Sequence, residues 1–188
     1  MPAACRLYNR VMYERFISID TETTGFSSAA RIIELAVILW VDGKIERVFD
    51  GLFDPSPIDW DAEDVKQAQS VNLIDREQLI GGATFESHAN MLDGFFQQAP
   101  VVVAHNAEFD CRMVRQEMER IGREFRPERI CCTMRLDQRI SPRPHRLDSC
   151  CARWGVELKN AHTAFADAKA CGELLLAIQR SGRMPKNM

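Results

Sequence analysis

The sequence predicts an α/β fold in which helices flank a mixed β-sheet. Two apolar strands joined by Asp42-Gly43 read as a hairpin, and the chain after them alternates helical patterns with short apolar strands. The length of 188 residues, 46% of them hydrophobic, suits a single core. We expect one domain over residues 1–188, with a core of about 15–180, a short N-terminal arm at 1–14 and a C-terminal tail at 181–188.

Five segments have the composition of strands. FISID ends on Asp20, RIIELAVILWV and KIERVFDGLF flank the hairpin turn, VVVAH is rich in β-branched residues, and RICCTM follows a helical pattern. These segments predict a five-stranded sheet with strands at residues 16–20, 31–41, 44–53, 101–105 and 129–134.

Helical spacing of apolar residues predicts four helices. They span residues 85 to about 98, Asn106 to Gly122, 147–154 and 163–178. The first helix has one apolar stripe of Phe85, Ala89, Leu92 and Phe96. In the last helix the residues expected to face the core are Ala164, Ala168, Cys171, Leu175 and Ile178. Residues 54–74 contain two prolines and many acids, so we expect a loop with short helical pieces there, followed by a capping box at Asp75 and Gln78. Residues 135–146, which include SPRP, read as a basic loop.

The composition argues against a membrane protein, a secreted protein and a protein held together by zinc or disulfides. No apolar run has the length of a membrane span, and the N-terminus has no apolar segment of a secretory signal, so the expected location is cytoplasmic. The cysteines lack CxxC spacing, which argues against a zinc site and a disulfide framework and predicts reduced core residues. They are Cys5, Cys111, Cys131, Cys132, Cys150, Cys151 and Cys171.

Charge is distributed unevenly along the chain. Residues 1–111 hold 18 acids and 8 bases, whereas residues 112–153 hold 6 acids and 11 bases, all of them arginines. Arginine suits phosphate oxygens, so this basic segment could guide a polyanion. It could equally form a solvated helix face, because Arg112, Arg115, Arg120 and Arg123 stand near helical pair spacing from Glu117, Glu119 and Glu124.

Three short motifs carry the chemistry: Asp20 and Glu22 in DTETTG, Asp110 in HNAEFD, and His162 with Asp167 in HTAFAD. Each alone is more often structural than functional. Together they place four carboxylates and one imidazole at strand and helix ends, and carboxylates that fold together need divalent cations between them. Hard oxygen ligands favour Mg²⁺ or Mn²⁺, and two such ions about 4 Å apart can promote hydrolysis of a phosphodiester.

These motifs resemble the three exonuclease motifs of the DEDDh group of 3′-to-5′ exonucleases, which includes the proofreading epsilon subunit of bacterial DNA polymerase III, exonuclease X and ribonuclease T. The resemblance covers about residues 15–180, and RIIELAV, CTM at 132–134 and LDSCC also match in place. It implies a ribonuclease H-like fold. It also implies hydrolysis of DNA from the 3′ end to nucleoside 5′-monophosphates.

The resemblance also implies a role for each residue. Asp20, Glu22 and Asp167 would hold the metal that carries the attacking water, Asp20 would bridge to a second metal supported by Asp110, and His162 would be the general base. The terminal nucleotide would lie against a second set of residues: Thr23, Thr24 and Asn106, with Phe26 or Phe109 flanking its base.

The expected partner is nucleic acid with a single-stranded 3′ end, DNA being favoured over RNA. Alternatives are an RNA exonuclease similar to ribonuclease T or oligoribonuclease, and a nucleic-acid-binding domain without catalysis. Relatives often carry a His-Gly-Ile run where this chain has Val71, Asn72, Leu73 and Ile74, so contacts from that loop are not carried over. No long tail follows the last helix, so a polymerase partner is not evident and a stand-alone nuclease is expected. The oligomeric state stays open.

Overall fold

The computed structural model describes residues 13–185, so most of the expected N-terminal arm and the last three residues of the tail lie outside the described part. Five strands form one sheet in the order β3-β2-β1-β4-β5. The first three are antiparallel, and β4 and β5 run parallel to β1. Their bounds are β1 (Arg15–Thr23), β2 (Ile32–Val41), β3 (Lys44–Leu52), β4 (Val101–Ala104) and β5 (Arg129–Cys132). The predicted mixed five-stranded sheet is confirmed.

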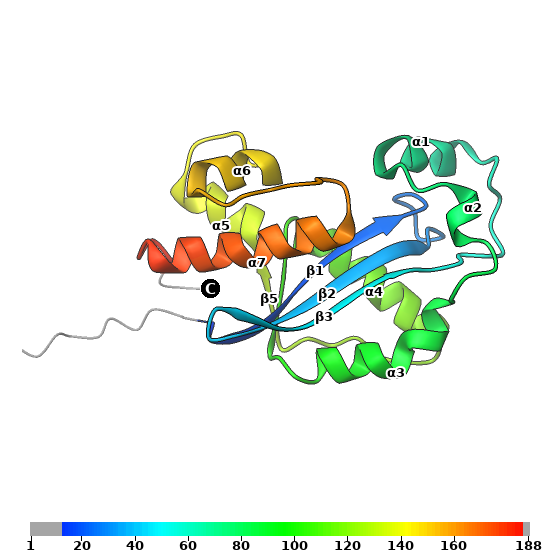
Figure 1. Ribbon diagram of the computed structural model, residues 1–188, viewed down its shortest axis with the longest axis horizontal. Coiled ribbons are helices and arrows are strands. Elements are labelled where there is room, and N and C mark those ends of the chain that lie inside the picture. The colour runs from blue at the N-terminus through cyan, green and yellow to red at the C-terminus, as the bar shows by residue number, and fades with distance from the viewer. Residues whose placement is uncertain (1–12, 186–188) are drawn as a thin grey trace, which may run out of the picture.

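Helices cover both faces of this sheet (Figure 1). One face packs against α3 (Phe85–Phe96) and α4 (Ala107–Arg120), and the other against α5 (Thr133–Ile140), α6 (Leu147–Trp154) and α7 (Ala164–Arg180). Alternation along β1 divides the two cores, since Ile17 and Ile19 face the first and Phe16 faces the second. The short helices α1 (Glu63–Asn72) and α2 (Arg76–Leu79) lie beyond the ends of β1 and β2.

The last helix approaches the sheet closely. A side chain at Gly172 would place its Cβ 2.4 Å from the Trp40 ring, so glycine is required where α7 crosses β2. The Trp40 indole N–H donates to Ser18 Oγ at 2.8 Å, which satisfies two buried polar groups on neighbouring strands. The five α7 residues predicted to face the core are all buried. This packing fixes the first turn of α7 above the end of β1.

Several predicted boundaries change in the structure. Helix α5 occupies part of the segment that was predicted to be a basic loop. The sequence did not predict this helix, because its buried stripe is narrow and the residues Thr133 and Leu136 stand among arginines. Residues 63–72 form a ten-residue helix rather than short pieces, and it too buries few apolar side chains. In α3 the fourth core residue is Phe95, three positions after Leu92, while Phe96 is only partly buried.

Both predicted helix caps are confirmed. Thr84 caps α3 by accepting from Ser87 N at 3.2 Å, and Gln78 accepts from Asp75 N at 2.7 Å in the capping box. The described cysteines are free and all but Cys132 are buried, while Cys5 lies outside the described residues. Within residues 13–185, no helix combines the length and apolar character needed to cross a bilayer.

Candidate active site

The four predicted carboxylates meet where β1 and β4 end. Asp20 and Glu22 occupy the end of β1, Asp110 stands in the first turn of α4 directly after β4, and Asp167 stands in the first turn of α7. Burial raises the pKa of Asp20 well above its usual value, and the negative charges of Asp110, Asp167 and Glu22 raise it further. Because these charges act on Asp20, all four side chains lie in one cluster.

Asp110 is anchored to the strand that carries Asp20. Its Oδ1 accepts from the backbone N–H of Thr21 at 3.1 Å and from Thr21 Oγ1 at 2.9 Å, and the side chain is buried. Burial raises the pKa of Asp110 to about 7 even though these Thr21 hydrogen bonds act in the opposite direction. The first turn of α4 is therefore tied to β1 through one carboxylate oxygen, and Oδ2 accepts none of the hydrogen bonds from Thr21.

A fifth carboxylate, Glu34, joins the cluster from β2. The register pairs Glu34 with Glu22, and burial together with the Glu34 charge raises the pKa of Glu22 to about 8. Glu34 Oε2 accepts from the backbone N–H of Ala164 at 3.1 Å, which connects β2 to the first turn of α7. Sequence reasoning noted the RIIELAV match but gave Glu34 no role. The hairpin register was the available signal, since residues opposite each other on paired strands share a face.

Asp167 carries the most direct indication of a missing partner. Its Oδ1 is buried and accepts no hydrogen bond. Burial raises the pKa of Asp167, although the backbone N–H and charge of His162 partly offset the increase. The nearby Cys171 thiol has a pKa raised by burial and by the charges of Asp20, Asp110 and Asp167, so it lies beside the cluster and stays protonated. An unpaired carboxylate oxygen beside further carboxylates suits a cation.

His162 enters the site from the loop before α7. Its backbone φ of 71° is left-handed, and Thr163 then caps the helix by accepting from Ala166 N. The side chain is exposed and lines two cavities, one of about 600 Å³ with Arg143, Arg146 and Asp167, and one of about 510 Å³ with Glu34 and Leu73. The imidazole therefore lies between solvent-accessible space and the carboxylate cluster.

The predicted nucleotide contacts divide into two groups. Thr23 Oγ1 donates to Gly25 O at 2.8 Å and Thr24 Oγ1 accepts from Arg31 N at 2.9 Å, so both buried hydroxyls shape the turn after β1. Asn106, by contrast, is exposed with a left-handed φ of 67°, and its side chain forms no cap hydrogen bond. Contact of all three residues with a nucleotide stays a prediction.

Two aromatic rings stand beside the turn. Phe26 is 72% exposed, and its ring centroid lies 5.6 Å from that of Phe109 at the start of α4. The pair offers an accessible aromatic surface of the kind on which nucleobases stack. Both residues were predicted, and the structure brings them together.

Buried Glu117 holds this turn against α4. It accepts from Arg31 Nε at 2.8 Å, from Arg120 Nη1 at 2.9 Å and from the backbone N–H of Ile32 at 3.1 Å. Arg120 also donates to the carbonyls of Ser28 and Ala30. With a further bond from Arg31 Nη2 at 3.2 Å, four donors compensate the cost of burying one carboxylate, so Phe26 and Phe109 are carried on two segments that are fixed to each other.

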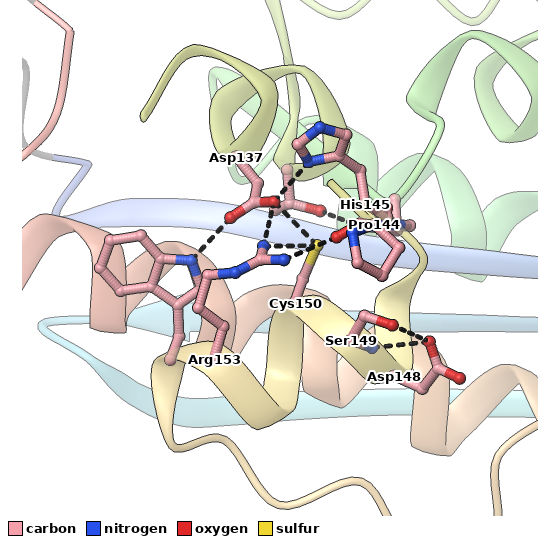
Figure 2. Close-up of polar contacts among 10 residues, drawn as sticks. Asp137, Pro144, His145, Asp148, Ser149, Cys150 and Arg153 are labelled. Atoms are coloured by element: carbon pink, nitrogen blue, oxygen red, sulfur yellow. Dashed lines mark hydrogen bonds and ion pairs between the residues drawn. The ribbon is translucent and has the colours of Figure 1, made fainter. Parts of the chain in front are cut away.

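A second polar network surrounds Asp137 (Figure 2), and its members Pro144 and His145 line the same cavity as His162. Fully buried Asp137 accepts from His145 Nδ1, Trp154 Nε1 and Arg153 Nη1, and Arg153 also donates to Pro144 O at 2.7 Å. Burial alone would raise the pKa of Asp137, but these hydrogen bonds outweigh it and hold the pKa well below its usual range. The network fixes the loop between α5 and α6. Sequence reasoning missed it because its members lie on three different segments, 8 to 17 residues from Asp137 in the chain.

The carboxylate cluster has the chemistry of a site for metal ions. Within residues 13–185, no three His, Cys, Asp or Glu side chains already form a closed ligand cage. The carboxylates nevertheless fit cations, because four acidic side chains converge, burial and mutual repulsion raise their pKa values, and the buried Asp167 Oδ1 has no partner. Divalent cations would remove the repulsion that raises these pKa values.

Comparison with known proteins identifies the family of the chain. Residues 17–175 match the model of the RNase_T family, described as exonuclease. The chain belongs to this exonuclease family. Exonucleases of this family generally use divalent metal ions.

Curated relatives of this exonuclease chain include DNA polymerases. A PolC-type DNA polymerase III of Halalkalibacterium halodurans is 31% identical over 164 residues, which cover 85% of this chain and 11% of the relative. The DNA polymerase III epsilon subunit of Buchnera aphidicola is 26% identical over 175 residues, 87% of this chain and 72% of the subunit. The chain spans 11–12% of the length of these PolC-type relatives.

Solved structures share the fold of this exonuclease. Exonuclease X in complex with 5′-overhanging duplex DNA superposes with a TM-score of 0.69 and 24% identity, covering 89% of this chain and 93% of that one. Escherichia coli exonuclease I with a dA16 oligonucleotide gives a TM-score of 0.73 and 18% identity over 91% of this chain and 42% of that one. The ribonuclease H-like fold implied by the sequence motifs is thus confirmed.

Proposed function

We propose that this exonuclease removes nucleotides from the 3′ end of DNA, releases nucleoside 5′-monophosphates and acts in the cytoplasm. The observation that carries the proposal is the convergence of Asp20, Glu22, Asp110 and Asp167 from three separate elements, with His162 at the edge of the cluster. Relatives named for DNA polymerase III and structures solved with DNA favour DNA as the substrate.

The carboxylates would hold two divalent cations, Mg²⁺ or Mn²⁺. Asp20, Glu22 and Asp167 would bind one ion, with the unpartnered Asp167 Oδ1 as a ligand, and Asp20 with Asp110 would bind the second. When bound, such ions make a water molecule more acidic and offset charge on the leaving oxygen. The remaining work falls to residues of the chain.

His162 would take the proton from the attacking water. Its ring is exposed beside Asp167, while its backbone N–H holds the Asp167 carboxylate, so the same residue orients a ligand and presents a base. Phe26 and Phe109 would flank the terminal base, and Asn106 would reach the nucleotide from the start of α4, with Thr23 and Thr24 lining the turn below it.

The test is digestion of a 5′-labelled single-stranded DNA 20-mer with Mg²⁺. We expect a ladder of products that shorten from the 3′ end, release of deoxynucleoside 5′-monophosphates, and little cleavage of an oligonucleotide with 3′-terminal phosphorothioates. Asp20→Asn should abolish shortening. Asp42→Asn is the matched control, because Asp42 is an exposed turn residue that loses the same charge.

Two results would contradict the proposal: a folded wild-type protein that leaves the DNA intact, or an Asp20→Asn variant with near-normal turnover. Parallel digestion of an RNA with the matching sequence decides whether the substrate contains deoxyribose or ribose. Faster shortening of the RNA than of the DNA would replace DNA by RNA as the substrate. Strong binding with no hydrolysis, even with Mn²⁺, would favour a binding domain.

A further inference from the structure

A large cavity at the outer edge of the sheet has no role in the site described above. It encloses about 780 Å³ between α4, β5 and α5. Its walls carry the arginines Arg115, Arg129, Arg135 and Arg139, and its floor includes Ile130 and Leu136. We call this the arginine cavity.

The position of β5 leaves this region open. Strand β5 is last in the sheet order and pairs only with β4 among the described residues. Ile130 on β5 is 46% exposed inside the cavity. An edge with an apolar floor and basic walls is accessible to a ligand.

Among the eleven arginines of residues 112–153, six illustrate two kinds of pairing in the structure. Arg120, Arg123 and Arg153 are tied to Glu117, Asp93 and Asp137 within the fold. Arg115 and Arg129 form no ion pair with a described residue, and Arg135 pairs with Glu108 at 2.7 Å where both side chains are exposed. Such an exposed pair contributes little to stability and can exchange its partner. The two interpretations of the basic segment therefore apply to different arginines.

The arginine cavity is continuous with the candidate active site. A neighbouring cavity of about 390 Å³ shares Glu108 and Arg115 with it and is lined also by Asn106, Phe109 and Arg112. The Arg112 guanidinium lies 5.2 Å from the centre of the Phe109 ring. Basic side chains thus lead along α4 from the proposed nucleotide contacts to the sheet edge.

We propose that the arginine cavity binds the phosphodiester backbone of the nucleic-acid substrate outside the nucleotide that is hydrolysed. This inference rests on the proposed function, since the same substrate occupies both places. Arginine forks bind phosphate oxygens without reading sequence, and the apolar floor at Ile130 and Leu136 can contact bases or sugars. The cavity adds affinity for long strands and leaves the chemistry at the 3′ end unchanged.

The experiment compares long and minimal substrates in the double variant Arg115→Gln, Arg129→Gln. Binding of a fluorescein-labelled single-stranded DNA 20-mer is measured by anisotropy in EDTA, so that no hydrolysis is needed for the readout. Loss of two phosphate contacts should flatten the slope of log K against log salt by about 1.4 and weaken binding about tenfold or more at low salt. Hydrolysis of the p-nitrophenyl ester of thymidine 5′-monophosphate should keep its kcat/KM within about twofold.

The matched control is Arg126→Gln, Arg180→Gln, which removes the same charge from exposed positions outside the cavity. Equal affinity of the two double variants for the 20-mer would overturn the proposal. An equal loss of affinity for the 20-mer and for thymidine 5′-monophosphate would also overturn it, because the cavity would then be a mononucleotide site. Failure of the proposed function shows itself separately, as a wild-type protein that hydrolyses neither substrate.

Discussion

Replacing Glu22 by glutamine is expected to stabilise the folded protein at pH 8 in EDTA while it abolishes hydrolysis. The pKa of Glu22 is raised from 4.5 to about 8 by burial and by the charge of Glu34. The native state therefore holds a proton that the unfolded state releases. Stability from this group is complete below pH 4.5 and is lost as the pH rises through about 8.

The size of the effect follows from the same shift. An increase from 4.5 to about 8 corresponds to an upper limit of about 5 kcal/mol, at about 1.4 kcal/mol for each tenfold change. Water and monovalent ions that reach this half-buried side chain reduce the penalty, so we expect Glu22→Gln to raise the free energy of unfolding by about 1–2 kcal/mol at pH 8. At pH 5 both proteins carry a neutral side chain there, and the difference should nearly vanish.

The assay is urea denaturation in EDTA at pH 5 and pH 8, followed by circular dichroism. Glu46→Gln serves as the control, because Glu46 lies exposed on β3 outside the cluster. Addition of Mg²⁺ at pH 8 should stabilise the wild type more than Glu22→Gln. The reasoning is refuted if Glu22→Gln destabilises the protein at pH 8, or if its effect equals that of Glu46→Gln at both pH values.

Three further outcomes are expected. His162→Ala should lower kcat by about 10²–10⁴-fold, the usual contribution of a general base, with little change in Mg²⁺ affinity by calorimetry; loss of Mg²⁺ binding would make His162 a ligand instead. Asp137→Asn should lower the free energy of unfolding by about 2–4 kcal/mol at pH 7, because it weakens a buried charge network, and by progressively less as the pH falls below the usual Asp pKa of 3.8, because the unfolded state then binds a proton that the folded carboxylate does not. Phe26→Ala should raise KM for DNA about tenfold through lost base stacking, with a melting temperature close to that of the wild type because Phe26 is 72% exposed.

The sequence predicted those parts of the molecule that depend on local periodicity. Asp20 and Glu22 are two residues apart, so an extended strand had to present both on one side. The helical spacing from Ala164 to Ile178 identified the buried face of α7, and Asp42-Gly43 located the hairpin. In these cases the residues that interact are neighbours in the chain or on one element.

The remaining features depend on contacts between distant segments. Glu34 belongs to the cluster only because the β1–β2 register places it opposite Glu22. Glu117 lies in a helix whose charge pattern predicted surface pairs, yet it is buried under Arg31, which is 86 residues away. Asp137 lay in a segment that seemed too polar for a helix, and four partners from two other segments account for its burial.

The candidate site draws its carboxylates from distant parts of the chain. Asp20 is on the first strand and Asp167 on the last helix, and the bond from Ala164 N to Glu34 joins those ends. A growing polypeptide on the ribosome therefore carries no complete carboxylate cluster until α7 has been synthesised and has docked.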